Sequence, residues 1–185
     1  MHKKIALALV VAWVMSGQEA DAQQYACKSG KIHFFSKSPI EDIEAVSKNA
    51  VCVVNASTAK VVAKIPVKTF GFKDKLMEEH FNENYLETDI FPNAGFDAAI
   101  AEKIDYAKDG VYDVTLKGTL DLHGVKQPRE VRGKLTVKNG QIANATADFN
   151  VKLADHKIKI PKAVVMNIAE EIKVDLNFDF EPYVK

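Results

Sequence analysis

Apolar and polar side chains alternate through residues 111–138, and this alternation is the clearest structural signal in the chain. Over residues 111–123 the apolar positions share one parity: Tyr112, Val114, Leu116, Leu120 and Leu122. Because successive strand side chains point to opposite faces, this pattern predicts a half-buried strand. The segment 124–128 contains Gly124 and Pro128, which predict a turn, and alternation resumes over 131–138. The pattern therefore predicts an antiparallel hairpin with one apolar and one charged face.

Further alternating or β-rich runs predict strands at residues 31–36, 51–54, 60–70, 96–106, 141–153 and 172–181. Asn139-Gly140 predicts a tight turn between two of them. Residues 40–46 fit either a helical turn or an edge strand. At residues 73–85 the period changes, because Leu76, Met77, His80 and Phe81 recur at helical spacing. One short amphipathic helix is therefore expected.

About eight strands, one helix and no alternation of strand and helix predict an all-β protein. An antiparallel barrel of about eight strands removes both sheet edges, and we expect this lipocalin-like architecture, with the helix covering an end or side. A two-sheet sandwich is the main alternative.

The N-terminus has the features of a secretory signal peptide. A cationic M-H-K-K start precedes an apolar run over residues 5–15 and the small-residue site Ala20-Asp21-Ala22. We expect a signal peptide at 1–22, a single domain at 23–185, and a periplasmic or secreted protein. The apolar run is short for a bilayer span and no later run is longer, so no transmembrane segment is expected. In an exported chain, Cys27 and Cys52 could form a disulfide or remain two buried thiols.

Charge and motifs exclude several function classes. The chain has 25 basic and 25 acidic residues, which gives no basic footprint for nucleic acid. The histidines do not follow a metal-ligand spacing, and no nucleophile elbow or phosphate loop is present. We therefore expect no cofactor, no metal and no catalytic residue.

Small residues on the apolar parity predict space inside the barrel. Gly118, Gly133, Ala143, Ala145 and Ala147 are all small. The walls would be apolar, formed by Phe34, Leu116, Leu120, Phe149, Leu176 and Phe178. Such a lumen suits a hydrocarbon chain, since each buried methylene contributes about 0.8 kcal/mol. Alternatively, the small residues accommodate aromatic side chains across the core, or the helix packs there.

Three segments together resemble the YceI-like family of exported lipid-binding barrels. They are M-E-E-H-F-N-E-N-Y-L-E-T-D-I-F-P-N-A-G-F at 77–96, G-T-L-D-L-H-G-V-K-Q-P at 118–128, and D-H-K-I-K-I-P at 155–161 with the closing strand I-K-V-D-L at 172–176. Residues 36–50 depart from the family pattern. The resemblance implies a lipocalin-like barrel, a periplasmic location and binding of polyisoprenoid chains such as quinone precursors or their pyrophosphates.

The expected function is therefore binding and carriage of an isoprenoid or other long-chain lipid. On the helix and its connector, Leu76, Met77, His80, Phe81 and Phe91 complete the candidate ligand-binding set. His80 could contact a polar head group or simply pack. Two alternatives stay open: an enzyme that acts on a small apolar molecule with His80 as acid or base, and a stress or assembly protein that acts through its surface.

Overall fold

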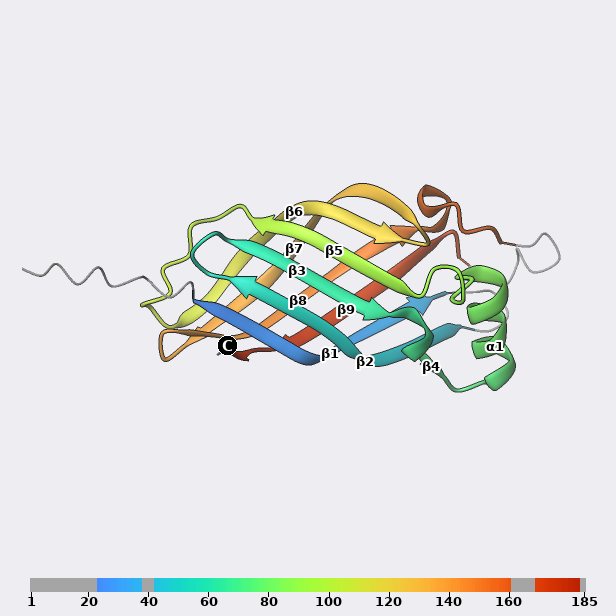
Figure 1. The fold of residues 1–185 in the computed structure, drawn as a ribbon, viewed down its shortest axis with the longest axis horizontal. Helices are drawn as coiled ribbons and strands as arrows, with labels where there is room; N and C mark the ends of the chain where they lie inside the picture. The colour runs from blue at the N-terminus through green and yellow to red at the C-terminus, as the bar shows by residue number, and fades with distance from the viewer. Residues whose placement is uncertain (1–22, 38–41, 161–168, 184–185) are drawn as a thin grey trace, which may run out of the picture.

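The computed structural model describes residues 23–37, 42–160 and 169–183, and its dominant feature is a closed antiparallel barrel (Figure 1). Strands of 7 to 14 residues wind around one elongated core. The barrel strands are β1 (Gln24–Ser36), β2 (Ile43–Asn55), β3 (Lys60–Pro66), β5 (Asn93–Ile100), β6 (Gly110–Leu122), β7 (Val125–Lys138), β8 (Gln141–Lys152) and β9 (Glu171–Asp179).

Strand pairing confirms the predicted eight-stranded barrel and not the sandwich. Each barrel strand pairs with its neighbour in sequence, and β1 closes the ring by pairing with both β2 and β9. Two short strands, β4 (Gly71–Phe72) and β10 (Glu181–Pro182), pair with β2 and β1 at the margins. The ambiguous 40–46 segment becomes strand from Ile43 onward, while residues 40 and 41 lie outside the described part of the chain, as does the predicted signal peptide.

The hairpin between β6 and β7 is tighter than predicted. Its turn is only His123-Gly124, and both residues have positive φ, 52° and 67°. A two-residue turn with both residues in the left-handed region matches the twist of the flanking strands. β7 therefore begins at Val125, and Pro128 lies within this strand, opposite Thr119. The predicted turn at 124–128 was therefore wrong in extent. The Asn139-Gly140 turn is confirmed, with φ of 54° and 72°.

The predicted strand at 96–106 was also misplaced. β5 starts at Asn93 and ends at Ile100. Beyond Ile100 the Glu102 carboxylate accepts a hydrogen bond from the Thr115 backbone N–H at 2.7 Å. A longer β5 would need this N–H of β6 as the donor for its own backbone, so the strand ends here. Ile104 and Tyr106 are still partly buried against the core. Their alternating spacing reflects this packing and not a strand.

The predicted helix is confirmed and lies across one end of the barrel (Figure 1). It consists of α1 (Lys75–His80) followed directly by a π-helical turn, η2 (Phe81–Tyr85). Asp74 caps α1, because its carboxylate accepts hydrogen bonds from the backbone N–H groups of Leu76 and Met77. Glu78 also accepts from the Phe72 backbone N–H, which fixes the helix to β4.

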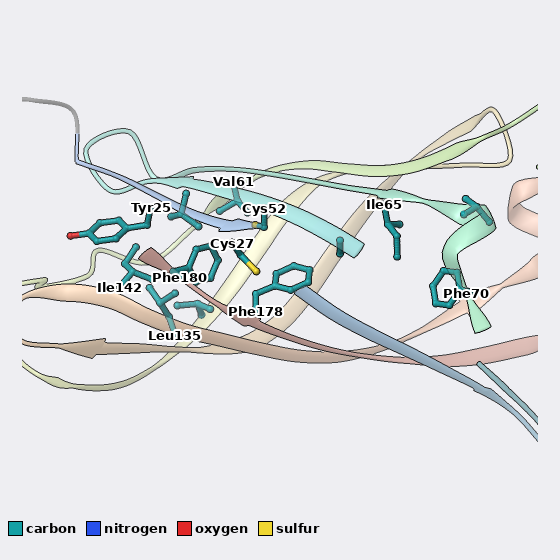
Figure 2. Close-up of a cluster of buried hydrophobic side chains, with 14 of the residues drawn as sticks. Tyr25, Cys27, Cys52, Val61, Ile65, Phe70, Leu135, Ile142, Phe178 and Phe180 are labelled. Atoms are coloured by element: carbon teal, nitrogen blue, oxygen red, sulfur yellow. The ribbon is translucent and has the colours of Figure 1, made fainter. Parts of the chain in front are cut away.

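The opposite end of the barrel is filled by side chains, which we call the packed end. Its members are at most 8% exposed: Tyr25, Cys27, Cys52, Leu135, Ile142 and Phe180. Figure 2 shows Tyr25, Ile142, Leu135 and Phe180 close together, with Phe70 far from them toward the helix. Cys52, Leu135 and Phe180 also border the internal space, which extends from them toward the helix. In the described part of the chain, no helix has both the length and the apolar character needed to cross a membrane.

Candidate binding cavity

An apolar cavity of about 280 Å³ lies inside the barrel. This is close to the lower end of ligand pockets, which run from about 300 to 1,000 Å³. Side chains from all eight barrel strands and from the helix line it, and nearly all of them are aliphatic or aromatic. The cavity can therefore bury an apolar molecule, but it provides few groups to pair with a polar one.

Most of the predicted ligand-binding residues line this cavity. They come from four strands and the helix: Phe34, Met77, Phe81, Leu116, Leu120, Ala145, Ala147, Phe149, Leu176 and Phe178. On β6 and β9 the alternation placed the side chains correctly, since Val114, Leu122, Ile172 and Val174 on the same parities also line the cavity. The position of these residues is established, whereas their role in binding stays a prediction.

Leu76 and His80 do not belong to the cavity. Leu76 is 59% exposed, and His80 is also exposed. The helix turns Met77, Phe81 and Tyr85 inward, which are spaced four residues apart and so share one face. Leu76 and His80 share the neighbouring face and do not line the cavity, and their role in ligand binding stays a prediction. His80 therefore offers no acid or base to a molecule inside the cavity.

The small residues leave less space than predicted. Gly118 does not line the cavity: the position of a Cβ there is occupied by the β5 backbone at Asp97 and Ala98. At Gly133 a Cβ would lie 2.6 Å from the Thr146 carbonyl oxygen. These glycines therefore permit close approach of neighbouring strands, so reading them as cavity-forming was wrong.

Ala143 also has a different role from the predicted one. The register between β7 and β8 shifts after the Thr136–Asn144 pair, so that Val137 pairs with Ile142 and Ala143 forms a bulge. The bulge turns Ile142 into the core, where it is 1% exposed. Of the five predicted small residues, Ala145 and Ala147 are the ones that line the cavity.

Phe91 lies outside the lumen as well. Its ring packs on the His123 ring with centroids 4.5 Å apart, and it covers Gly124, where a Cβ would collide with it. Phe91 therefore packs against the β6–β7 turn and does not line the cavity. The role of Phe91 as a ligand-binding residue stays a prediction.

A cluster of aromatic rings closes the cavity beneath the helix, and we call it the aromatic end: Phe34, Phe70, Phe72 and Phe81. Phe34 and Phe81 are stacked with centroids 5.4 Å apart, and Phe72 and Phe81 are 4.9 Å apart. Phe70 packs edge-on to Phe34 at 5.3 Å. All four rings line the cavity, and Phe34 and Phe81 are only partly buried. Phe70 and Phe72 were missed from the sequence, because Phe70 follows a 3-10 turn (Val67–Thr69) and Phe72 ends a two-residue strand, and neither shows alternation.

His123 is a third residue that the sequence analysis did not single out. It is 9% exposed, with Nε2 2.8 Å from a Glu87 carboxylate oxygen and Nδ1 3.1 Å from the His156 carbonyl oxygen. The His156 ring in turn meets the Val125 carbonyl oxygen at 3.2 Å. This group, which we call the histidine latch, joins the three segments whose motifs gave the family resemblance.

Cys27 and Cys52 are register partners on β1 and β2, and both thiols are free and buried in the structure. Burial, and to a smaller extent the neighbouring Cys27, raise the pKa of Cys52 to about 12. Burial also raises the pKa of Cys27. The pairing of these cysteines in a disulfide stays a prediction, and their position on adjacent strands is compatible with it.

Metal ligands do not cluster in the described part of the chain: no group of three or more His, Cys, Asp or Glu side chains there could hold an ion.

Comparison with known proteins agrees with this geometry. The family model described as YceI-like domain matches residues 28–180. Among solved structures, a polyisoprenoid binding domain from Saccharophagus degradans, implicated in plant cell wall breakdown, has a TM-score of 0.71 at 14% identity over 86% of this chain and 98% of that one. BcnA from Burkholderia cenocepacia gives 0.65 at 17% identity, over 80% and 94% of the two chains.

A YceI protein from Campylobacter jejuni gives a TM-score of 0.57 at 14% identity, over the full length of both chains. No curated protein matches the chain. These likenesses establish the fold, and the match over most of the sequence establishes the family. The chain belongs to the YceI-like family.

Proposed function

We propose that this protein binds one long-chain lipid of the isoprenoid type in the barrel lumen and carries it, chemically unchanged, through the periplasm or an extracellular space. The apolar cavity beneath the aromatic end is the observation that supports binding. The polyisoprenoid-binding relative from Saccharophagus degradans supports an isoprenoid as the ligand. The signal peptide expected at residues 1–22 supports export.

The energetics favour a chain-like ligand. Burying each methylene contributes about 0.8 kcal/mol, so three isoprene units contribute on the order of 12 kcal/mol. Association costs about 4 to 15 kcal/mol, and a preformed cavity keeps this cost toward the lower end of the range. A ligand of a few isoprene units can therefore bind stably, whereas a small polar molecule gains little from these walls.

The catalytic alternative has less support. It relied on His80, which is exposed and outside the cavity. A binding role requires only enclosure, which the described side chains provide.

Native mass spectrometry of the protein purified from its own cell envelope tests the proposal. We expect an adduct whose mass, after organic extraction, is that of a prenyl-chain lipid. Ala147→Phe places a ring in the cavity and should abolish the adduct, whereas Asn150→Phe, at an exposed position of the same strand, should retain it. Purification of wild-type protein with no lipid, together with failure to take up geranylgeraniol added in excess, would contradict the proposal.

A further inference from the structure

Arg129 is a cation on the inward face of the barrel. On β7 it pairs with Gly118 of β6, between the inward pairs Leu116–Val131 and Leu120–Gln127. Its side chain is half-buried and lines the cavity. Lys64 and Lys134 also border the cavity, but both occupy outward positions on their strands; Lys64 is exposed and Lys134 pairs with Asp113 at 2.8 Å.

No carboxylate neutralises Arg129 among the described residues. The neighbouring acid, Glu130, points outward and pairs with Lys117 and Arg132. Among the described residues, the Arg129 guanidinium instead lies over the Phe149 ring, with its Cζ atom 5.7 Å from the ring centroid. A guanidinium left half-buried without an anion is costly, since charged groups inside proteins are normally paired. An anionic partner would relieve this cost.

The wall beside Arg129 is a seam between β7 and β8. Backbone pairing of these strands runs from Lys138–Gln141 to Gly133–Ala147 and stops there, although β8 continues in its pairing with β9 as far as Lys152. In the described chain, residues 125–132 of β7 therefore have no ladder partner on this side. Side chains close the seam, because Val131 and Val151 are buried.

Two further features show that the seam is built into the chain. Pro128 lacks a backbone N–H, and proline is accommodated in a strand where no ladder partner requires that donor. At its far end the seam is closed by the turn after β8: the Gln127 side-chain amide donates to the Asp155 carbonyl oxygen at 3.0 Å. Arg129 and Phe149 lie between these limits, one on each strand.

We propose that Arg129 binds the anionic oxygen head group, a carboxylate or a phosphate, of the lipid whose chain fills the lumen, with the head group seated at the β7–β8 seam. The proposal rests on the proposed function and adds to it the chemical class of the ligand. The planar guanidinium can donate two parallel hydrogen bonds to either oxyanion. The Phe149 ring holds it in position while it does so.

Matched probes separate the head group from the chain. Tetradecanoate and tetradecanol share a chain length and differ in charge, as do farnesyl phosphate and farnesol. Wild-type protein should bind each anion about tenfold or more tightly than its alcohol, as expected for a charge-assisted hydrogen bond. Acetate and inorganic phosphate should not compete with these probes, because they bury no chain. Comparison of the two anions identifies which head group the site prefers.

Arg129→Met keeps the length of the stem and removes the charge. It should abolish the preference for the anion over the alcohol, while Arg129→Lys should restore part of that preference. Arg132→Met is the matched control, because Arg132 lies three residues along the same strand with an 86% exposed side chain. It should behave as wild type.

Two outcomes would overturn the proposal. If wild-type protein binds acid and alcohol equally, or if Arg129→Met preserves the preference, Arg129 does not bind the head group while lipid binding itself stands. If no probe binds to wild-type protein, the proposed function fails as well. Far-UV circular dichroism and thermal unfolding confirm that each variant is folded, and the alcohol affinity of Arg129→Met shows that its lumen is intact.

Discussion

The two ends of the barrel use the same kinds of residue in different ways. At the packed end, Tyr25 and Ile142 are 0% and 1% exposed, so their contacts surround them on all sides. At the aromatic end, Phe34 and Phe81 present part of their surface to the cavity and are covered by a helix of six residues and a π-helical turn. The side chains of the packed end are covered by protein, whereas those of the aromatic end keep surface that a bound molecule can contact.

This difference indicates how stability and binding are separated in the molecule. Removing a side chain that is packed on all sides leaves a cavity, and this cavity lowers the free energy of unfolding. A ring that already borders an empty space has fewer contacts to lose, and a ligand can replace them. The aromatic end is therefore where sequence changes should alter binding more than folding.

The largest expected contrast concerns Cys52 at the packed end. With a pKa of about 12 instead of 9.0, its thiolate fraction at pH 8 falls by roughly a thousandfold. In reduced native protein, Cys52 should resist iodoacetamide at pH 8 and react rapidly once unfolded in guanidinium chloride. Mass spectrometry of peptides after brief labelling measures this protection. Rapid native labelling of Cys52 would show that the packed end opens.

The same experiment without reductant decides the disulfide prediction. If Cys27 and Cys52 are paired, neither will be labelled even in guanidinium chloride until a reductant is added.

In the reduced protein, the raised pKa of the Cys52 thiol gives stability that is present below pH 9, where the thiol is protonated in both the folded and the unfolded state. That stability should decline as pH rises from about 9 towards 12, because the unfolded thiol ionises first.

A smaller effect is expected from the histidine latch near the helix. His123→Ala removes the contacts to Glu87 and to the His156 carbonyl oxygen, and should lower the free energy of unfolding by about 1–3 kcal/mol. Hydrogen exchange should increase mainly at residues 86–91 and 153–158. Protection at the packed end should change only by the global loss of stability.

His80→Ala provides the matched control, because His80 is an exposed histidine at the same end of the barrel. We expect it to match wild type within about 0.5 kcal/mol. Glu87→Gln keeps an acceptor for His123 but removes the charge, so it should lie between the two alanine variants. Equal destabilisation by His80→Ala and His123→Ala would contradict the latch.

Strand alternation predicted much of the barrel because one face of each strand is buried. On β9, Ile172, Val174, Leu176 and Phe178 all line the cavity as their parity indicates, and Phe180 just beyond the strand does so too. The same rule failed beyond Ile100, where Tyr106 is partly buried against the core from an irregular segment. Periodicity reports burial, and burial does not require a strand.

The site was less predictable, because its shape depends on contacts between strands. Gly118 was read as open space, but the β5 backbone occupies the position of its missing side chain. Arg129 has no apolar character, so the search for lumen residues overlooked it, although its register opposite Gly118 places it inside. Counting along β7 from the correct two-residue turn would have placed Arg129 on the inward face, but the predicted turn was too long to give this register.

The smallest expected effects come from the helix, where two adjacent residues face different surroundings. Leu76 is 59% exposed, whereas Met77 lines the cavity. Leu76→Ser should change both the free energy of unfolding and farnesol affinity little, by less than about 0.5 kcal/mol. Met77→Ser should weaken farnesol binding several-fold, because it removes part of the apolar wall. Denaturant titration and farnesol titration on both variants make the comparison. Weaker farnesol binding by Leu76→Ser than by Met77→Ser would mean that the helix presents its other face to the ligand, and the aromatic end would then need to rearrange when the lumen is filled.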